Sequence, residues 1–143
     1  MKKLLALGAL FLFTAAYAAI AAPNVADPWI RWLPGDLPAA GYATIDNPGD
    51  KAIELTGADC DAYAKVMLHR SFRDNGMSHM QMVSGITIPA HGHISLAPGG
   101  FHLMLMHAKH PVKPGDKVTI KLHFSDGSSR SVEFPVRPAN ATG

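Results

Sequence analysis

At 143 residues the chain has room for one domain with a sizeable hydrophobic core. Its formal net charge of +2 comes from Lys2 and Lys3, since without them 11 basic residues face 11 acidic ones. A near-neutral domain argues against nucleic acid or an anionic membrane as a partner. The single cysteine, Cys60, excludes a disulfide within the chain, and the flanking Asp59 and Asp61 should raise its pKa, so we expect a structural thiol.

Residues 1–22 have the pattern of a secretory signal peptide. Two lysines precede an apolar run over residues 4–13, and small residues then offer several A-x-A cleavage sites. We expect cleavage somewhere in residues 18–22, followed by export of the domain without a membrane anchor. No cysteine lies near these sites, so a lipoprotein is not expected.

Residues 23–137 consist of short strand-like segments separated by turns rich in Pro and Gly. Residues 25–37 form an entry segment with at most one short strand. Further strands are predicted at 40–47, 51–57, 62–69, 93–96, 101–107, 117–124 and 132–136. Residues 77–88 should form one or two short strands, with a break at Ser84-Gly85. Apolar and polar residues alternate most regularly over 117–124, and no helical period is found. These features predict a single all-β domain, an antiparallel Greek-key β-sandwich, followed by a short disordered tail at 138–143.

Histidine and methionine are concentrated in the middle of the chain. Seven of the eight histidines and six of the seven methionines lie between Met67 and His110. In the strand over 101–107, His102 and Met104 should share one face, with apolar residues on the other. Imidazole and thioether together suit copper, above all Cu(I), so this face is a candidate metal site.

The spacing of four of these residues resembles a known family. His69, Met80, His102 and Met104 follow the pattern His-x10-Met-x21-His-x-Met of the periplasmic copper chaperones called PCuAC. Other shared features are Trp29 and Arg31 before a Pro-Gly stretch, residues 39–42, the Pro-Gly-Gly at 98–100 and the Gly-Asp at 115–116. The resemblance covers about residues 25–136. The chain differs in having Arg70 where an acidic residue is usual, and in lacking a tail rich in His and Met.

The resemblance implies a cupredoxin-like sandwich that binds one Cu(I) through His69, Met80, His102 and Met104. It also implies a metallochaperone and not an enzyme. Its acceptor would be a copper-binding protein such as cytochrome c oxidase subunit II, which holds a binuclear copper site. We expect the chaperone to be a monomer.

Other interpretations share parts of this pattern. A copper resistance or storage protein could use the same site, whereas a cupredoxin-type electron carrier needs a cysteine close before its second histidine, and none is there. A sandwich without metal is a third class. A second, Cu(II)-preferring site is a further possibility, although solvated side chains are favoured for its candidates, which are Met77, His79, His91, His93, His107 and His110. For the neighbouring Met67, Met82 and Met106, packing is favoured over ligation.

Overall fold

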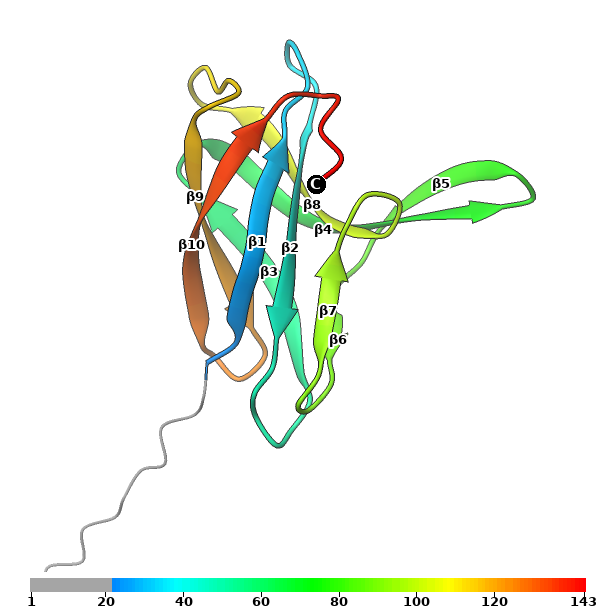
Figure 1. The fold of residues 1–143 in the computed structure, drawn as a ribbon, viewed down its shortest axis with the longest axis vertical. Helices are drawn as coiled ribbons and strands as arrows, with labels where there is room; N and C mark the ends of the chain where they lie inside the picture. Colours follow the sequence, from blue (N-terminus) through cyan, green and yellow to red (C-terminus); the bar gives the residue numbers. More distant parts are fainter. Residues whose placement is uncertain (1–21) are drawn as a thin grey trace, which may run out of the picture.

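The computed structural model describes residues 22–143, which form ten β-strands (Figure 1). The strands are β1 (Asn24–Arg31), β2 (Ala39–Asp46), β3 (Ile53–Cys60), β4 (Tyr63–Asp74), β5 (Met77–Met82), β6 (Ile86–Ile88), β7 (His93–Leu96), β8 (Phe101–Ala108), β9 (Lys117–Phe124) and β10 (Ser129–Arg137). The expected signal peptide lies outside the described residues except for Ala22. Within residues 22–143, no helix is long and apolar enough to span a membrane.

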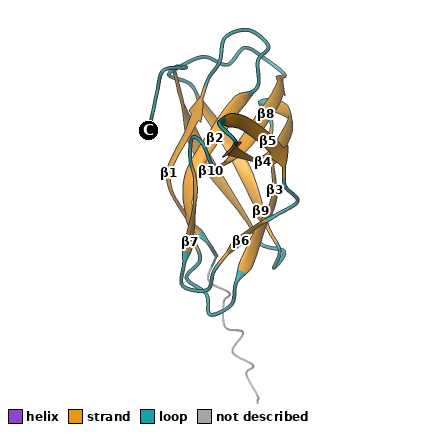
Figure 2. Cartoon of the chain, turned by 90° about the vertical axis from the view of Figure 1, so that its right-hand side faces the viewer, coloured by secondary structure: helices purple, strands orange, loops and turns teal. Residues whose placement is uncertain are grey.

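The strands form two packed layers that are continuous at one edge. One layer has the order β5-β4-β8-β7-β2-β1 and the other the order β10-β9-β3-β6, and parallel pairing of β1 with β10 joins them. Nearly all other neighbours are antiparallel, with β7 and β8 the exception. Figure 2 shows the described chain from the side, built of strands and loops alone. The prediction of an all-β sandwich is confirmed.

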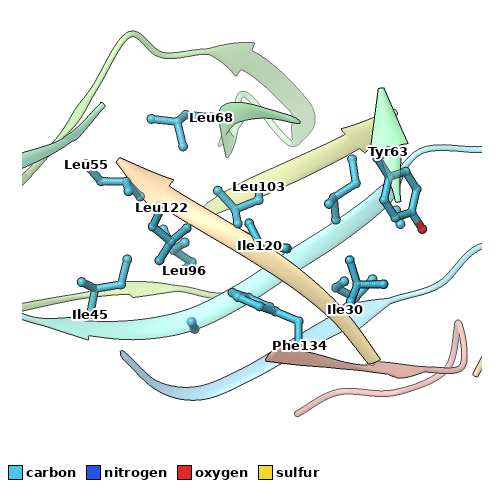
Figure 3. Packing of buried hydrophobic residues seen from close by; sticks show 14 of the residues in the cluster. Ile30, Ile45, Leu55, Tyr63, Leu68, Leu96, Leu103, Ile120, Leu122 and Phe134 are labelled. Carbon is cyan, nitrogen blue, oxygen red and sulfur yellow. The ribbon is translucent and has the colours of Figure 1, made fainter. Parts of the chain in front are cut away.

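The core lies between the layers and follows the alternation of the strands. In β9, the exposed residues Lys117, Thr119 and Lys121 alternate with buried apolar residues. The buried residues are Val118, Ile120, Leu122 and Phe124. Phe134 and Val136 from β10 add to the same core. Figure 3 shows Leu103 of β8 among the buried side chains of the facing layer. Burial of this apolar surface is the main force that holds the layers together.

Strand β8 has a core face and an outer face. Leu103 and Leu105 are fully buried in the core, so His102 and Met104 lie on the opposite face. Gly41 of β2 pairs with Leu103, and a Cβ at this glycine would lie 3.2 Å from the Cβ of Leu103. A larger residue at this position would therefore force β2 or β8 to shift by a few tenths of an ångström. The core face thus fixes the strand that carries the candidate ligands.

The end of the chain is held against the sandwich. Arg31 donates hydrogen bonds from Nε and a terminal nitrogen to the carbonyl oxygen of Ala141, at 3.2 and 3.0 Å. The sequence predicts a disordered tail at 138–143, whereas in the structure this tail returns to the end of β1. The bonded residues are 110 positions apart, so local composition carries no sign of the contact.

The single cysteine gives a first testable prediction. Cys60 is half-buried against the core, and burial raises the pKa of its thiol, with the charges of Asp59 and Asp61 acting in the same direction. A raised pKa lowers the thiolate fraction at a given pH. We expect iodoacetamide to alkylate the folded protein several-fold more slowly than free cysteine at neutral pH, with the rate rising toward alkaline pH. A rate equal to that of free cysteine would contradict this.

Candidate metal centre

Two histidines from neighbouring strands form the centre of the site. His69 of β4 pairs directly with His102 of β8, and their ring centroids are 5.8 Å apart. Leu68 and Leu103, one position away on each strand, point into the core. Because side chains alternate along a strand, both imidazoles lie on the outer face of the layer.

The two predicted thioethers flank this pair. Met104 follows His102 by two residues on the same face of β8. Met80 of β5 lies opposite Ser71, which follows His69 by two residues on β4. Met80, His102 and Met104 all line one open cavity of about 480 Å³. The structure therefore brings the four residues of the sequence pattern to one face, although they come from three strands.

His69 is the least satisfied polar side chain of the described region. Both of its ring nitrogens are buried, and neither has a hydrogen-bond partner. A buried polar atom left unpaired costs about 1–3 kcal/mol, so it calls for an explanation. Burial lowers the pKa of His69, and the adjacent His102 lowers it further. The imidazole is therefore neutral at neutral pH, with a lone pair free for a metal ion.

His102 is oriented by its own backbone. The residue is only 4% exposed, and its Nδ1 lies 3.2 Å from the carbonyl oxygen of Gly100. A carbonyl oxygen can only accept, so Nδ1–H donates this bond. The other nitrogen, Nε2, then carries the lone pair. In metal sites, a histidine ligand usually donates its other ring N–H to a carbonyl or carboxylate in this way, which fixes the tautomer and the orientation of the ring.

The thioether of Met80 lies near the surface. Met80 is 53% exposed, and it belongs to the β4–β5 hairpin, which projects from the body of the sandwich (Figure 1). Met82, on the same hairpin, is 67% exposed and pairs directly with His69. For Met82 the sequence favours packing, whereas the structure leaves this thioether exposed beside His69. Among the four candidate ligands, His102 is buried and Met80 is open to solvent.

The cavity wall also contains residues that the metal-ligand pattern did not select. Arg31 and Tyr42 line the same cavity as His102 and Met104. Tyr42 packs at 6.4 Å from the ring of His102, measured between centroids. Arg31 belongs to the Trp-x-Arg element, which the sequence marked only as part of the family resemblance.

The five histidines considered for a second copper site lie in different parts of the fold: His79, His91, His93, His107 and His110. His91 bonds through Nε2 to a carboxylate oxygen of Asp50 at 2.7 Å. His79 stacks on Phe72 in the hairpin. His107 and His110 line a separate cavity of about 690 Å³. Among residues 22–143, no three His, Cys, Asp or Glu side chains are grouped to hold a metal, and the second site stays a prediction.

Comparison with known sequences identifies relatives along most of the chain. The family model described as "LpqE-like: Putative lipoprotein LpqE-like" matches residues 24–136. "Putative lipoprotein Lxx21020" from Leifsonia xyli subsp. xyli (strain CTCB07) is 37% identical over 115 residues, which cover 80% of this chain and 69% of the relative. "Uncharacterized protein RP573" from Rickettsia prowazekii (strain Madrid E) is 27% identical over 125 residues, 84% of this chain and 69% of the relative.

Solved structures show the same fold. The Cu(I) form of DR1885 from Deinococcus radiodurans is 32% identical with a TM-score of 0.65, and the match covers 90% of this chain and 85% of that one. The apo PCuAC domain of PmoF2 superposes with a TM-score of 0.70 over 87% of this chain and 96% of that domain, at 22% identity. At 22% identity the second match concerns the fold alone. The cupredoxin-like sandwich implied by the sequence pattern is therefore confirmed.

Proposed function

This chain belongs to the LpqE-like family and has the fold of the PCuAC domains, and on that premise we propose that it is a periplasmic metallochaperone for Cu(I). Two of its structural neighbours, DR1885 and the PmoF2 domain, were solved with copper bound. We assign one Cu(I) ion to His69, Met80, His102 and Met104. The observation that carries this assignment is His69, whose two buried, unpaired nitrogens lie beside His102 on the face that holds both thioethers.

The chemistry of the four donors favours Cu(I) over harder ions. Cu(I) is a soft d¹⁰ ion that accepts thioether sulfur and imidazole nitrogen in a low-coordinate site. Thioethers are neutral and need no deprotonation, so acid weakens this site only by protonating its histidines. Mg²⁺ and Ca²⁺ require oxygen ligands, and no carboxylate lines the cavity among the described residues.

The position of the ligands is suited to release as well as to binding. Met80 is more than half exposed on the projecting hairpin, whereas His102 is buried. Thiolates of an acceptor can approach from the Met80 side and replace the neutral ligands one at a time. A cysteine ligand would hold copper more tightly and would be open to oxidation in this compartment. Cys60 lies on β3 in the other layer, which also argues against a blue-copper electron carrier.

The first test is the ligand set itself. Anaerobic competition with a chromogenic Cu(I) chelator is expected to show one tightly bound ion. X-ray absorption of the loaded protein is expected to show two sulfur and two nitrogen ligands per copper, because Met80, His102 and Met104 line one cavity and His69 lies beside His102. Fewer than two sulfurs per copper would contradict the assignment. A third sulfur would indicate an additional thioether, for which Met82, paired with His69, is a candidate.

We propose cytochrome c oxidase subunit II as the acceptor, since its binuclear copper site supplies the thiolates that this exchange requires. A resistance or storage protein with the same site is the alternative. Mixing the Cu(I)-loaded protein with apo subunit II is expected to transfer copper and restore the binuclear site. No transfer, together with copper-sensitive growth when the gene is deleted, would favour the resistance or storage function instead.

A further inference from the structure

Arg31 places a fixed positive charge in the wall of the copper cavity. It is the last residue of β1 and lines the cavity together with His102 and Met104. Its guanidinium is held by the two hydrogen bonds to Ala141. It also lies over two aromatic rings, 5.5 Å from the centroid of Trp29 and 5.4 Å from that of Tyr42. Because these hydrogen bonds and aromatic contacts restrain the side chain, the guanidinium stays in the cavity wall and does not rotate freely into solvent.

One aromatic ring, that of Tyr42, lies near both this charge and a predicted ligand. Tyr42 is 5% exposed and packs against the guanidinium of Arg31 on one side and the ring of His102 on another. Burial raises the pKa of Tyr42, and the charge of Arg31 acts in the opposite direction. The phenol is therefore neutral at neutral pH. No countercharge from Tyr42 offsets the guanidinium within the wall.

The rest of the cavity does not neutralise the guanidinium either. Among the described residues that line it, Arg31 is the only lysine or arginine, and none is a carboxylate. A second guanidinium, that of Arg137, lies 5.4 Å from the ring of Trp29. The fixed charges in and next to the cavity wall are therefore both positive, which is unusual for a site that binds a cation.

We propose that Arg31 sets the charge selectivity of the copper site, so that monovalent Cu(I) is preferred over Cu(II) and other divalent ions. This inference rests on the proposed Cu(I) function. The repulsion between a fixed charge and an ion is proportional to the charge of the ion, so Arg31 opposes a divalent ion twice as strongly as a monovalent one. The smaller penalty on Cu(I) weakens its binding slightly, which also favours transfer to an acceptor.

The proposal predicts how the change in Cu(II) affinity in an Arg31 variant is related to the change in Cu(I) affinity. Arg31→Gln removes the charge but keeps a donor for the carbonyl of Ala141. If this variant raises Cu(I) affinity about fivefold, it should raise Cu(II) affinity at the same site about 25-fold. The electrostatic free energy doubles with the charge of the ion, so the logarithm of the gain in affinity doubles as well. The midpoint potential of the one-copper protein should then fall by about 40 mV, since a tenfold change corresponds to 59 mV for one electron. Cu(II) bound elsewhere is subtracted with the variant His102→Ala.

Two matched variants separate charge from packing. Arg31→Lys keeps the charge but loses the planar stack, so it should retain the wild-type ratio of Cu(II) to Cu(I) affinity. Arg130→Gln removes one positive charge from an arginine that bonds to Pro23 at the opposite end of β1. It should leave the midpoint potential within about 10 mV of the wild type, since a charge at the far end of β1 is largely screened by solvent and salt.

Each outcome bears on one of the two proposals. A wild-type protein that binds no Cu(I) would refute the proposed function and this inference together. Wild-type binding of Cu(I) with equal changes in Cu(I) and Cu(II) affinity in Arg31→Gln would refute the inference alone. The same holds if Arg31→Lys behaves like Arg31→Gln, because the role of Arg31 would then be packing. Charge selectivity would be supported if Arg31→Gln increased the logarithm of Cu(II) affinity twice as much as that of Cu(I) affinity, while Arg31→Lys kept the wild-type ratio of the two affinities.

Discussion

Replacement of Met104 by leucine is expected to weaken Cu(I) binding by about 100-fold or more. Loss of a residue that only supports a ligand costs about 10–100-fold in metal affinity, and loss of a ligand should cost at least as much. Leucine has nearly the volume of methionine but no sulfur, so the fold should lose less than about 1.5 kcal/mol of stability. Affinity is measured by anaerobic competition with a Cu(I) chelator, and stability by unfolding of the apo protein in urea.

Met106 provides the control for this experiment. It lies two residues after Met104 on the same face of β8, but it pairs with Lys65, whereas Met104 pairs with Met67 on the His69 side. Met106→Leu should therefore leave Cu(I) affinity within about threefold of the wild type, well below the loss expected for a ligand. Equal losses in the two variants would show that this face binds copper through a diffuse set of thioethers rather than through Met104.

The strands and their faces could be predicted because alternation is a local property. The buried and exposed positions of β9 follow directly from the pattern of residues 117–124. In β8 the same rule placed Leu103 and Leu105 on one face and His102 and Met104 on the other. The segment 25–37 was harder to interpret, because Pro28 lies within β1 and a bulge interrupts the pairing with β2.

The site could be predicted only in part, because distance in space is not a local property. The spacing pattern selected His69 and His102, and the register of β4 with β8 places them side by side. The contact of Arg31 with Ala141 and the pairing of Met82 with His69 depend on how distant segments fold back. A pattern along the chain contains no such information. For this reason the charged wall of the cavity became visible only in the structure.

Leu103 connects the stability of the sandwich to the copper site. It lies between His102 and Met104 on β8, is fully buried, and pairs with Leu68 of β4 and Gly41 of β2. Leu103→Ala leaves a cavity that the close-packed layers can fill only in part. We expect the free energy of unfolding of the apo protein to fall by about 2–5 kcal/mol, measured by reversible urea unfolding.

A matched substitution at an exposed leucine tests whether burial causes this loss. Leu37 is 59% exposed, so Leu37→Ala should change the free energy of unfolding by less than about 0.5 kcal/mol. A loss below about 1 kcal/mol in Leu103→Ala would show that β8 is not anchored by this side chain.

Cu(I) at 1,000 times its Kd should raise the free energy of unfolding of the wild type by about 4 kcal/mol. A smaller increment in Leu103→Ala at the same Cu(I) concentration would show that the anchor also positions His102 and Met104 for the metal.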